Sequence, residues 1–126
     1  MKMKTFAAAV NCMDGRVQEP VIRYLKKHFE VDYVDMITEP GPDGILSEEQ
    51  EGFRVNSIKQ RLDISINKHG SKIILMVGHD DCAGNPVDKE THIVQSLNSA
   101  ARIKKWYPDV EVIPVWINDR WEVEPI

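Results

Sequence analysis

Hydrophobic positions along the chain follow two alternating periods. Short runs in which nearly every residue is apolar are typical of β-strands that are buried on both faces. Longer segments in which apolar residues recur every three or four positions predict helices with one buried face. The short runs predict strands at 5–10, 33–37, 72–77 and 110–117, followed by a short edge strand at 121–126.

The helical period occupies three segments between these strands, at residues 18–28, 55–69 and 88–106. Pro20 is expected in the first turn of the first helix, where its missing N–H costs nothing, and Gly70 is expected just after the second helix ends. The basic residues at the end of the first helix suit its dipole. In the third helix, the inward positions are predicted to be Ile93, Leu97, Ala100 and Ala101.

The segment 39–44 contains two prolines and two glycines, which predicts an irregular turn after the second strand. Ser47 followed by Gln50 fits a capping box that would open a helical turn at 48–51. A solvated acidic face explains the same residues more simply.

The alternation of strands and helices predicts an α/β fold with a mostly parallel sheet of four to five strands and helices on both faces. In such sheets, ligands bind beyond the carboxyl ends of the strands, where the strand order reverses. In the flavodoxin-like order, this point lies between the first and third strands of the sequence. We therefore expect the residues of a functional site to lie directly after positions 10 and 77.

Composition narrows the class of protein. A chain of 126 residues fits a single domain spanning 1–126, and its net charge of −4 with no block of Lys or Arg argues against a nucleic-acid partner. No apolar run approaches the roughly 20 residues of a membrane span, and the apolar stretch after the basic N-terminus is too short for a signal peptide. We expect a cytoplasmic protein whose partners are small molecules or another copy of itself.

Both cysteines lie in two polar clusters at the expected strand ends. These clusters read Cys12-Met13-Asp14-Gly15-Arg16 and His79-Asp80-Asp81-Cys82. Without an export signal, a disulfide is not expected. Two thiolates and one imidazole predict a zinc site whose fourth position stays open for water or substrate, although iron or cobalt would fit nearly as well.

Simpler interpretations exist for each of these residues. Either cysteine alone would be an ordinary buried side chain. Asp14 and Arg16 would form a loop salt bridge, or Asp14 would cap a helix, and we expect Asp80 and Asp81 to act as caps. The joint pattern at two strand ends favours the metal site.

Cys-x-Asp-x-Arg after the first strand, with Gly-His-x-x-Cys after a later one, resembles the β-class carbonic anhydrases over nearly the whole chain. The resemblance implies strand order 2-1-3-4 and Zn²⁺ held by Cys12, His79 and Cys82. It also implies a catalytic dyad of Asp14 and Arg16, in which Asp14 either orients the fourth ligand or becomes that ligand in a closed state. Family members are usually homodimers or dimer-based oligomers. Gly15 and Ala83 depart from residues common in the family.

The expected reaction is the reversible hydration of carbon dioxide to bicarbonate by a metal-bound hydroxide. Two alternatives stay open. The same site could hydrolyse carbonyl sulfide or carbon disulfide, or it could be a non-catalytic zinc module with Asp14 as a permanent fourth ligand. His92 could accept the proton, but we interpret it as a solvated residue on a polar helix face.

Overall fold

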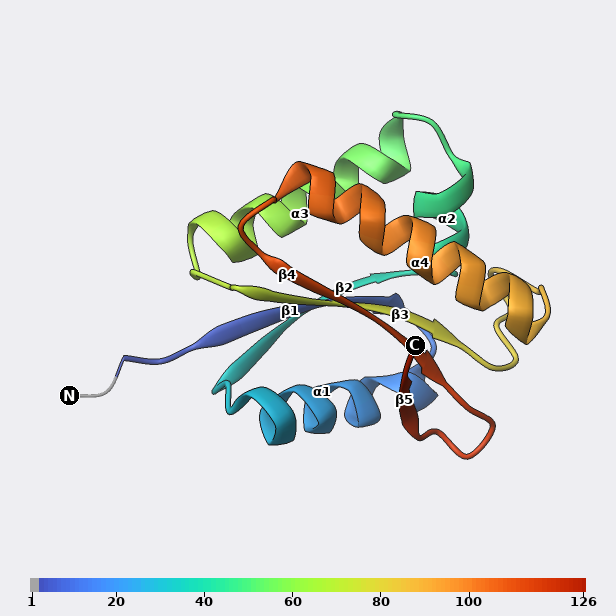
Figure 1. Ribbon diagram of the computed structural model, residues 1–126, viewed down its shortest axis with the longest axis horizontal. Coiled ribbons are helices and arrows are strands. Elements are labelled where there is room, and N and C mark those ends of the chain that lie inside the picture. Colours follow the sequence, from blue (N-terminus) through green and yellow to red (C-terminus); the bar gives the residue numbers. More distant parts are fainter. Residues whose placement is uncertain (1–2) are drawn as a thin grey trace.

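A computed structural model describes residues 3–126 and shows an α/β architecture built on one five-stranded sheet (Figure 1). The strand order is β2-β1-β3-β4-β5, in which the first four strands are parallel and β5 runs antiparallel to β4. The predicted fold class and the strand order 2-1-3-4 are confirmed. The strands are β1 Phe6–Cys12, β2 Tyr33–Glu39, β3 Ile73–His79, β4 Glu111–Ile117 and β5 Val123–Pro125.

Helices cover both faces of the sheet (Figure 1). Helix α1 lies on one face and the other three helices lie on the opposite face, so alternate residues of β1 and β3 enter two separate cores. Both faces of these strands are buried, which explains their unbroken apolar sequence. The helices are α1 Gly15–Phe29, α2 Pro42–Glu48, α3 Phe53–Asn67 and α4 Lys89–Trp106.

Helix α1 begins three positions earlier than the sequence pattern predicts. The carboxylate of Asp14 accepts a hydrogen bond from the backbone N–H of Arg16 and caps the helix at this point. Pro20 therefore lies inside the helix, and its predicted place in the first turn is wrong. The last turn carries Lys26, Lys27 and His28, as expected.

The segment expected to be irregular after β2 is partly helical. Helix α2 starts at Pro42, whose missing N–H is harmless at the first helical position, and Gly41 before it takes a left-handed φ of 64°. The helical turn considered at 48–51 does not form, because α2 ends at Glu48 and the chain is non-helical at 49–52. Glu48 and Glu51 are exposed, as the simpler interpretation of a solvated acidic face predicts. Gly70 is left-handed with a φ of 72°, but α3 ends at Asn67, so the glycine lies further from the helix end than predicted.

Helix α4 has nearly the predicted length, but its inward face differs from the prediction. Leu97 is 46% exposed and Ala101 is exposed, whereas mostly polar side chains are buried. The buried face consists of His92, Gln95, Ser96, Ser99, Ala100 and Ile103. Two of these polar residues have partners on α2: the Oδ2 of Asp43 lies 2.5 Å from the Nδ1 of His92, and Ser99 Oγ donates to the backbone oxygen of Asp43 at 3.0 Å.

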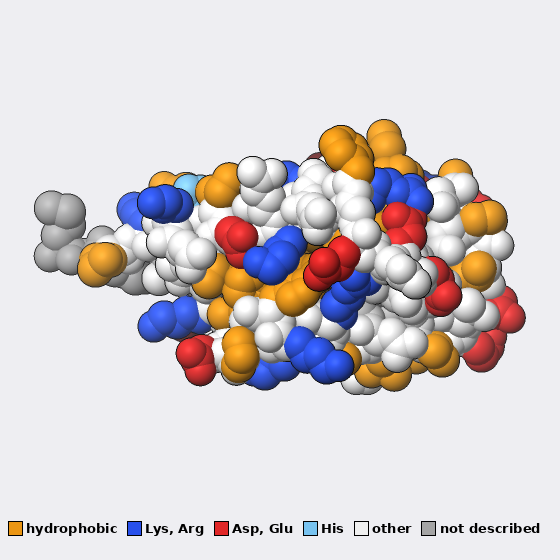
Figure 2. Space-filling model, turned by 90° about the horizontal axis from the view of Figure 1, so that it is seen from above, with side chains coloured by type: hydrophobic (Ala, Val, Ile, Leu, Met, Phe, Trp, Pro, Cys, Tyr) orange, Lys and Arg blue, Asp and Glu red, His pale blue; other side chains and the backbone are white. Residues whose placement is uncertain are grey.

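The face that carries α2, α3 and α4 has interspersed acidic and basic side chains and no broad field of one sign (Figure 2). Within residues 3–126, no helix has both the length and the apolar character that a membrane crossing requires.

Candidate metal centre

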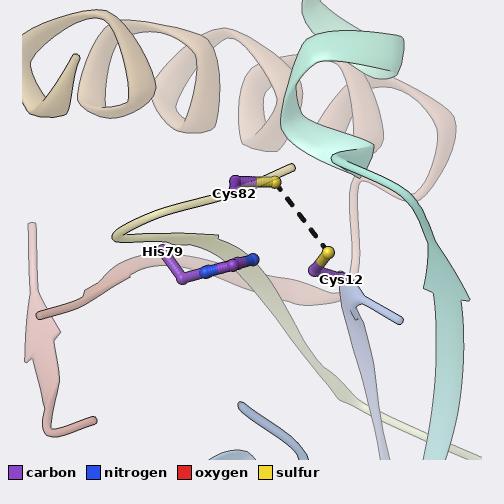
Figure 3. A group of neighbouring side chains, drawn as sticks. All are labelled: Cys12, His79 and Cys82. Atoms are coloured by element: carbon purple, nitrogen blue, oxygen red, sulfur yellow. Dashed lines mark hydrogen bonds between the residues drawn. The ribbon is translucent and has the colours of Figure 1, made fainter. Parts of the chain in front are cut away.

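The carboxyl ends of β1 and β3 bring the two cysteine clusters together. Cys12 is the last residue of β1, His79 is the last residue of β3, and these parallel strands are neighbours in the sheet. Cys82 follows three positions later in the loop after β3. The two sulfurs and a ring nitrogen of His79 all lie within 4.8 Å of one another, and the imidazole points toward the sulfurs (Figure 3).

The distance between the two sulfurs fits shared coordination of one metal ion. Cys12 Sγ and Cys82 Sγ are 3.9 Å apart, and both cysteines are free. A disulfide would require about 2.05 Å, whereas two thiolates on a tetrahedral zinc with Zn–S bonds of about 2.3 Å lie about 3.8 Å apart. The donor set and its spacing therefore suit a tetrahedral ion with three protein ligands.

His79 presents one ring nitrogen for such an ion. Its Nδ1 lies 2.7 Å from the backbone oxygen of Asp80, so Nδ1 carries the hydrogen and Nε2 keeps a lone pair. Nε2 is buried and has no hydrogen-bond partner among the described residues. A buried ring nitrogen that lacks a hydrogen-bond partner and lies beside two thiols is typical of a metal ligand in the metal-free state.

Burial alone would lower the pKa of His79. The nearby Cys12 thiolate and the Asp80 carbonyl, together with the negative charge of Asp14, outweigh burial and raise this pKa. Without metal, His79 therefore tends to hold an extra proton, which metal binding must displace.

The two thiols divide one proton between them. The neighbouring Cys82 thiol, the His79 imidazole and the backbone N–H groups of Gly41 and Asp14 favour the thiolate of Cys12 and lower its pKa. The pKa of Cys82 is raised, because its proton is donated to Cys12 and because burial opposes a second thiolate beside the first. A divalent cation would remove this conflict by neutralising both thiolates.

Asp14 and Arg16 form a bidentate ion pair next to these ligands. Arg16 Nε lies 3.0 Å from Asp14 Oδ1, and Nη2 lies 2.7 Å from Oδ2. The hydrogen bonds from Arg16 hold the pKa of Asp14 at about 2, so the carboxylate is charged at neutral pH. Asp14 is thus both the cap of α1 and the partner of Arg16, so the capping and salt-bridge interpretations are both correct.

Two residues that the sequence analysis did not assign to the site, Asp81 and Trp121, also contact Arg16. Asp81 Oδ2 lies 3.3 Å from Arg16 Nη1, and the backbone oxygen of Asp81 lies 3.2 Å from Nη2. The ring of Trp121, from the segment before β5, lies 4.3 Å from the guanidinium carbon. Asp80 and Asp81 do not cap a helix, since Asp88 caps α4 instead. No pattern in the sequence links Trp121 to Arg16.

A buried polar network supports the loop that carries Cys82. Asn85 donates from Nδ2 to Asp43 Oδ1 at 3.1 Å and to Gln95 Oε1 at 2.6 Å. His92 is 1% exposed and contacts Asp43, so its interpretation as a solvated residue is wrong. This burial also does not support His92 as a proton acceptor that exchanges with solvent.

The turn after β2 packs directly on the same loop. A Cβ atom added at Gly84 would lie 2.6 Å from the carbonyl carbon of Pro40, so only glycine fits there without a shift. The two turns therefore hold each other in place beside Cys12 and Cys82.

The comparisons with known proteins agree with this arrangement. A family model described as "Putative carbonic anhydrase" matches residues 2–126. The chain belongs to this carbonic anhydrase family. None of the curated proteins matches the sequence.

Solved β-carbonic anhydrases share the fold at low sequence identity. The carbonic anhydrase of Streptococcus mutans superposes with a TM-score of 0.61 at 15% identity, covering 100% of this chain and 86% of that one. A carbon disulfide hydrolase in its apo form gives 0.62 at 14% identity, covering 97% and 79%. A tetrameric β-carbonic anhydrase of Sordaria macrospora gives 0.55 at 13% identity, covering 98% and 82%. At these identities the likeness defines the fold.

Proposed function

We propose that this protein is a zinc-dependent carbonic anhydrase that hydrates carbon dioxide reversibly to bicarbonate. The observation that carries the proposal is the convergence of Cys12, His79 and Cys82 at one sheet edge beside the paired Asp14 and Arg16. The family to which the chain belongs supports the same reaction class.

Cys12, His79 and Cys82 would hold the ion, and each is prepared for this role by its surroundings. The Asp80 carbonyl fixes the His79 tautomer, and the pKa of Cys12 is lowered toward the thiolate form. Bound zinc would supply acidification of water near neutral pH, which carbon dioxide hydration requires. Two thiolates weaken this acidification relative to three histidines, so the neighbouring residues must contribute more.

Asp14 would orient the reacting water. The carboxylate is charged at neutral pH because Arg16 holds its pKa at about 2, so Asp14 accepts hydrogen bonds and does not donate one. Arg16 fixes the carboxylate plane through two N–H groups, and Gln18 donates to the backbone oxygens of Cys12 and Asp14 at 2.7 and 3.0 Å. This bracing supports the arrangement in which Asp14 aims a water in preference to the arrangement in which it becomes the fourth ligand.

The test is to measure zinc content and carbon dioxide hydration on the same purified samples. We expect about one zinc per chain and hydration above the buffer rate. Cys82→Ser should lose both zinc and activity, whereas Asp14→Asn should keep zinc and lose activity by about a hundredfold. Full zinc occupancy with no hydration at pH 7 to 9 would refute the proposal.

The fold shared with a carbon disulfide hydrolase gives a second candidate substrate class. Release of sulfide from carbon disulfide or carbonyl sulfide, without hydration of carbon dioxide, would favour that reaction. If zinc is present and neither reaction occurs, the site is a non-catalytic zinc module. In that case, a structure of the zinc form should show Asp14 as the fourth ligand.

We also propose that the protein self-associates, as the tetrameric Sordaria macrospora enzyme does. A cytoplasmic location stays a prediction.

A further inference from the structure

A cavity of about 650 Å³ lies at the amino ends of β1 and β3, where Phe6 and Ile73, the first residues of these strands, belong to its lining. Cys12 and His79 lie at the carboxyl ends of the same two strands, so this amino-end cavity and the candidate metal centre lie at opposite edges of the sheet (Figure 1). No residue of the candidate metal centre lines the cavity. Its volume is within the range of cavities that bind small molecules.

The walls of the amino-end cavity are mostly apolar and are held in place by contacts between distant segments. The ring of Phe6 is stacked on that of His69, with 4.3 Å between the ring centroids. The backbone N–H of Thr5 donates to Asp32 Oδ2 at 2.9 Å, and the backbone N–H of Asp32 donates to the Thr5 oxygen at 3.0 Å. These bonds tie the segment before β1 to the segment after α1. The apolar lining residues are Met3, Phe6, Phe29, Val31 and Ile73. A ligand that fills the cavity must therefore carry a large apolar part.

Two lysines give the lining of the cavity a positive charge. Lys4 and Lys72 precede β1 and β3, both are exposed, and neither side chain has an ion-pair partner within the described part of the chain. Glu30 is the one carboxylate among the lining residues that the structure describes. His69 adds no net charge, because Asp35 Oδ2 lies 2.6 Å from its Nδ1 and compensates a proton on the ring. The lining therefore favours a ligand with a single negative charge.

Helix dipoles do not account for these two lysines. The last turns of α1 and α4 each carry two lysines, where a positive charge complements the partial negative charge of the helix end. Lys4 and Lys72 instead come directly before strands, which have only small net dipoles. Their ammonium groups are therefore free to pair with an anionic ligand in the cavity.

We propose that the amino-end cavity binds an amphipathic monocarboxylate, with its hydrocarbon chain against Phe6, Phe29 and Ile73 and its carboxylate paired with Lys4 and Lys72. A carboxylate has two oxygens, so it accepts charge-assisted hydrogen bonds from both ammonium groups. Cavities of this size hold an unbranched chain of about ten carbons, and each CH₂ buried against the apolar walls strengthens binding about fourfold. The site uses no residue of the candidate metal centre, so the proposal does not depend on zinc or on catalysis.

The lining distinguishes this ligand from molecules that share only part of its chemistry. A neutral alcohol with the same chain would leave both lysines without an anionic partner. A short anion such as acetate would leave the apolar walls in contact with water. Inorganic phosphate would place a second negative charge beside Glu30 and would gain no apolar contact. Charge and apolar surface together therefore select an amphipathic monoanion.

The experiment is isothermal titration calorimetry of the full chain with decanoate, octanoate, 1-octanol and acetate, below the concentrations at which micelles form. We expect decanoate to bind with a dissociation constant on the order of 10 μM. Octanoate should bind about fifteenfold more weakly, because it lacks two CH₂ groups. The alcohol 1-octanol should bind about tenfold more weakly than octanoate, because it carries no charge, and acetate should not bind. Acetate that binds as tightly as decanoate, or decanoate that does not bind, would overturn the proposal.

Two variants and a matched control test whether binding occurs in this cavity. Lys72→Gln removes one cation and should weaken decanoate binding about tenfold, and Val31→Glu places a carboxylate in the apolar wall and should abolish binding. Lys68→Gln is the control, because Lys68 is exposed at the end of α3 but does not line the cavity, so binding should be unchanged. Circular dichroism checks that the variants are folded. Equal binding to Lys72→Gln and to the natural sequence, or equal losses in Lys72→Gln and Lys68→Gln, would refute the assignment.

Phosphatidylglycerol vesicles distinguish a soluble carboxylate from a membrane surface. Vesicles present many negative charges at once and attract clustered lysines without needing a cavity. We expect decanoate to bind and the protein to stay in the supernatant when the vesicles are sedimented. Sedimentation of the protein with the vesicles, combined with no binding of decanoate, would show that these lysines serve a lipid surface and would contradict the proposal.

Discussion

The guanidinium of Arg16 is stacked on the indole of Trp121, with 4.3 Å between the guanidinium carbon and the ring centroid. The N–H groups of the same guanidinium contact Asp14 and Asp81. Asp14 is therefore constrained through Arg16 by a residue from the last segment of the chain. This relationship connects the hairpin of β4 and β5 to the candidate metal centre.

Substitution of Trp121 by leucine should reduce carbon dioxide hydration about fivefold while zinc content stays the same. A cation–π contact of this kind contributes about 1 kcal/mol, and its loss lets Arg16 and Asp14 sample other positions. Stopped-flow hydration and metal analysis of the same samples test this. Trp106→Leu is a matched control, because Trp106 stacks on Arg102 on the other face of the sheet. Equal losses in both variants would contradict a specific role for Trp121.

The stability of the metal-free protein should show the ionised Asp14 in its pH dependence. The folded-state pKa of Asp14 is about 2, below the ordinary value near 4, so the charged carboxylate stabilises the fold above about pH 4. This stabilisation is lost as the pH falls from about 4 to about 2. Asp14→Asn keeps a good helix cap and removes only the charge, so its deficit in unfolding free energy should be present at pH 6 and shrink toward pH 2.

Urea unfolding of both proteins between pH 2 and pH 6 measures that deficit. Glu19→Gln is the control, because Glu19 forms an exposed ion pair with Arg23 at 3.7 Å that contributes little at any pH. A deficit for Asp14→Asn that stays constant over the whole range would mean that the charge of Asp14 is not what stabilises the fold.

The sheet was predictable from sequence because unbroken apolar runs indicate strands that are buried on both faces. The alternating order of strands and helices also restricts how the strands can be connected. The candidate ligands were predictable because Cys12 and His79 end two such runs. The inward face of α4 was not predictable, because His92 and Ser99 are buried through contacts with Asp43 of α2. Hydrophobic periodicity cannot predict burial that depends on polar contacts with another helix. The contact of Trp121 with Arg16 depends on how the final hairpin folds back, and the local sequence carries no signal for it.

Removal of metal should lower the thermal stability of the protein. A ligand that binds only the folded state stabilises it by about 2.7 kcal/mol at a hundredfold excess over its dissociation constant, which raises the melting temperature by several degrees. Calorimetry with zinc and then with a chelator tests this, and Cys82→Ser should show no such difference. Ser71→Ala is the control, because buried Ser71 bonds to Ser65 away from the site and should keep the zinc response. An unchanged melting temperature on zinc removal from the natural sequence would count against a bound ion.

Substitution of His92 by leucine should destabilise the protein by about 3 kcal/mol, because it removes the imidazole that contacts Oδ2 of the buried Asp43 side chain. His28→Leu is the matched control, since His28 is exposed in the last turn of α1, and it should cost less than about 0.5 kcal/mol. The double variant Asp43→Asn with His92→Leu should cost less than the sum of the two single variants, because both partners of the contact are then replaced together. Urea unfolding of the four variants measures these differences. Additive costs would show that Asp43 and His92 are not energetically coupled, and the 2.5 Å contact between them would then not be what holds α2 against α4.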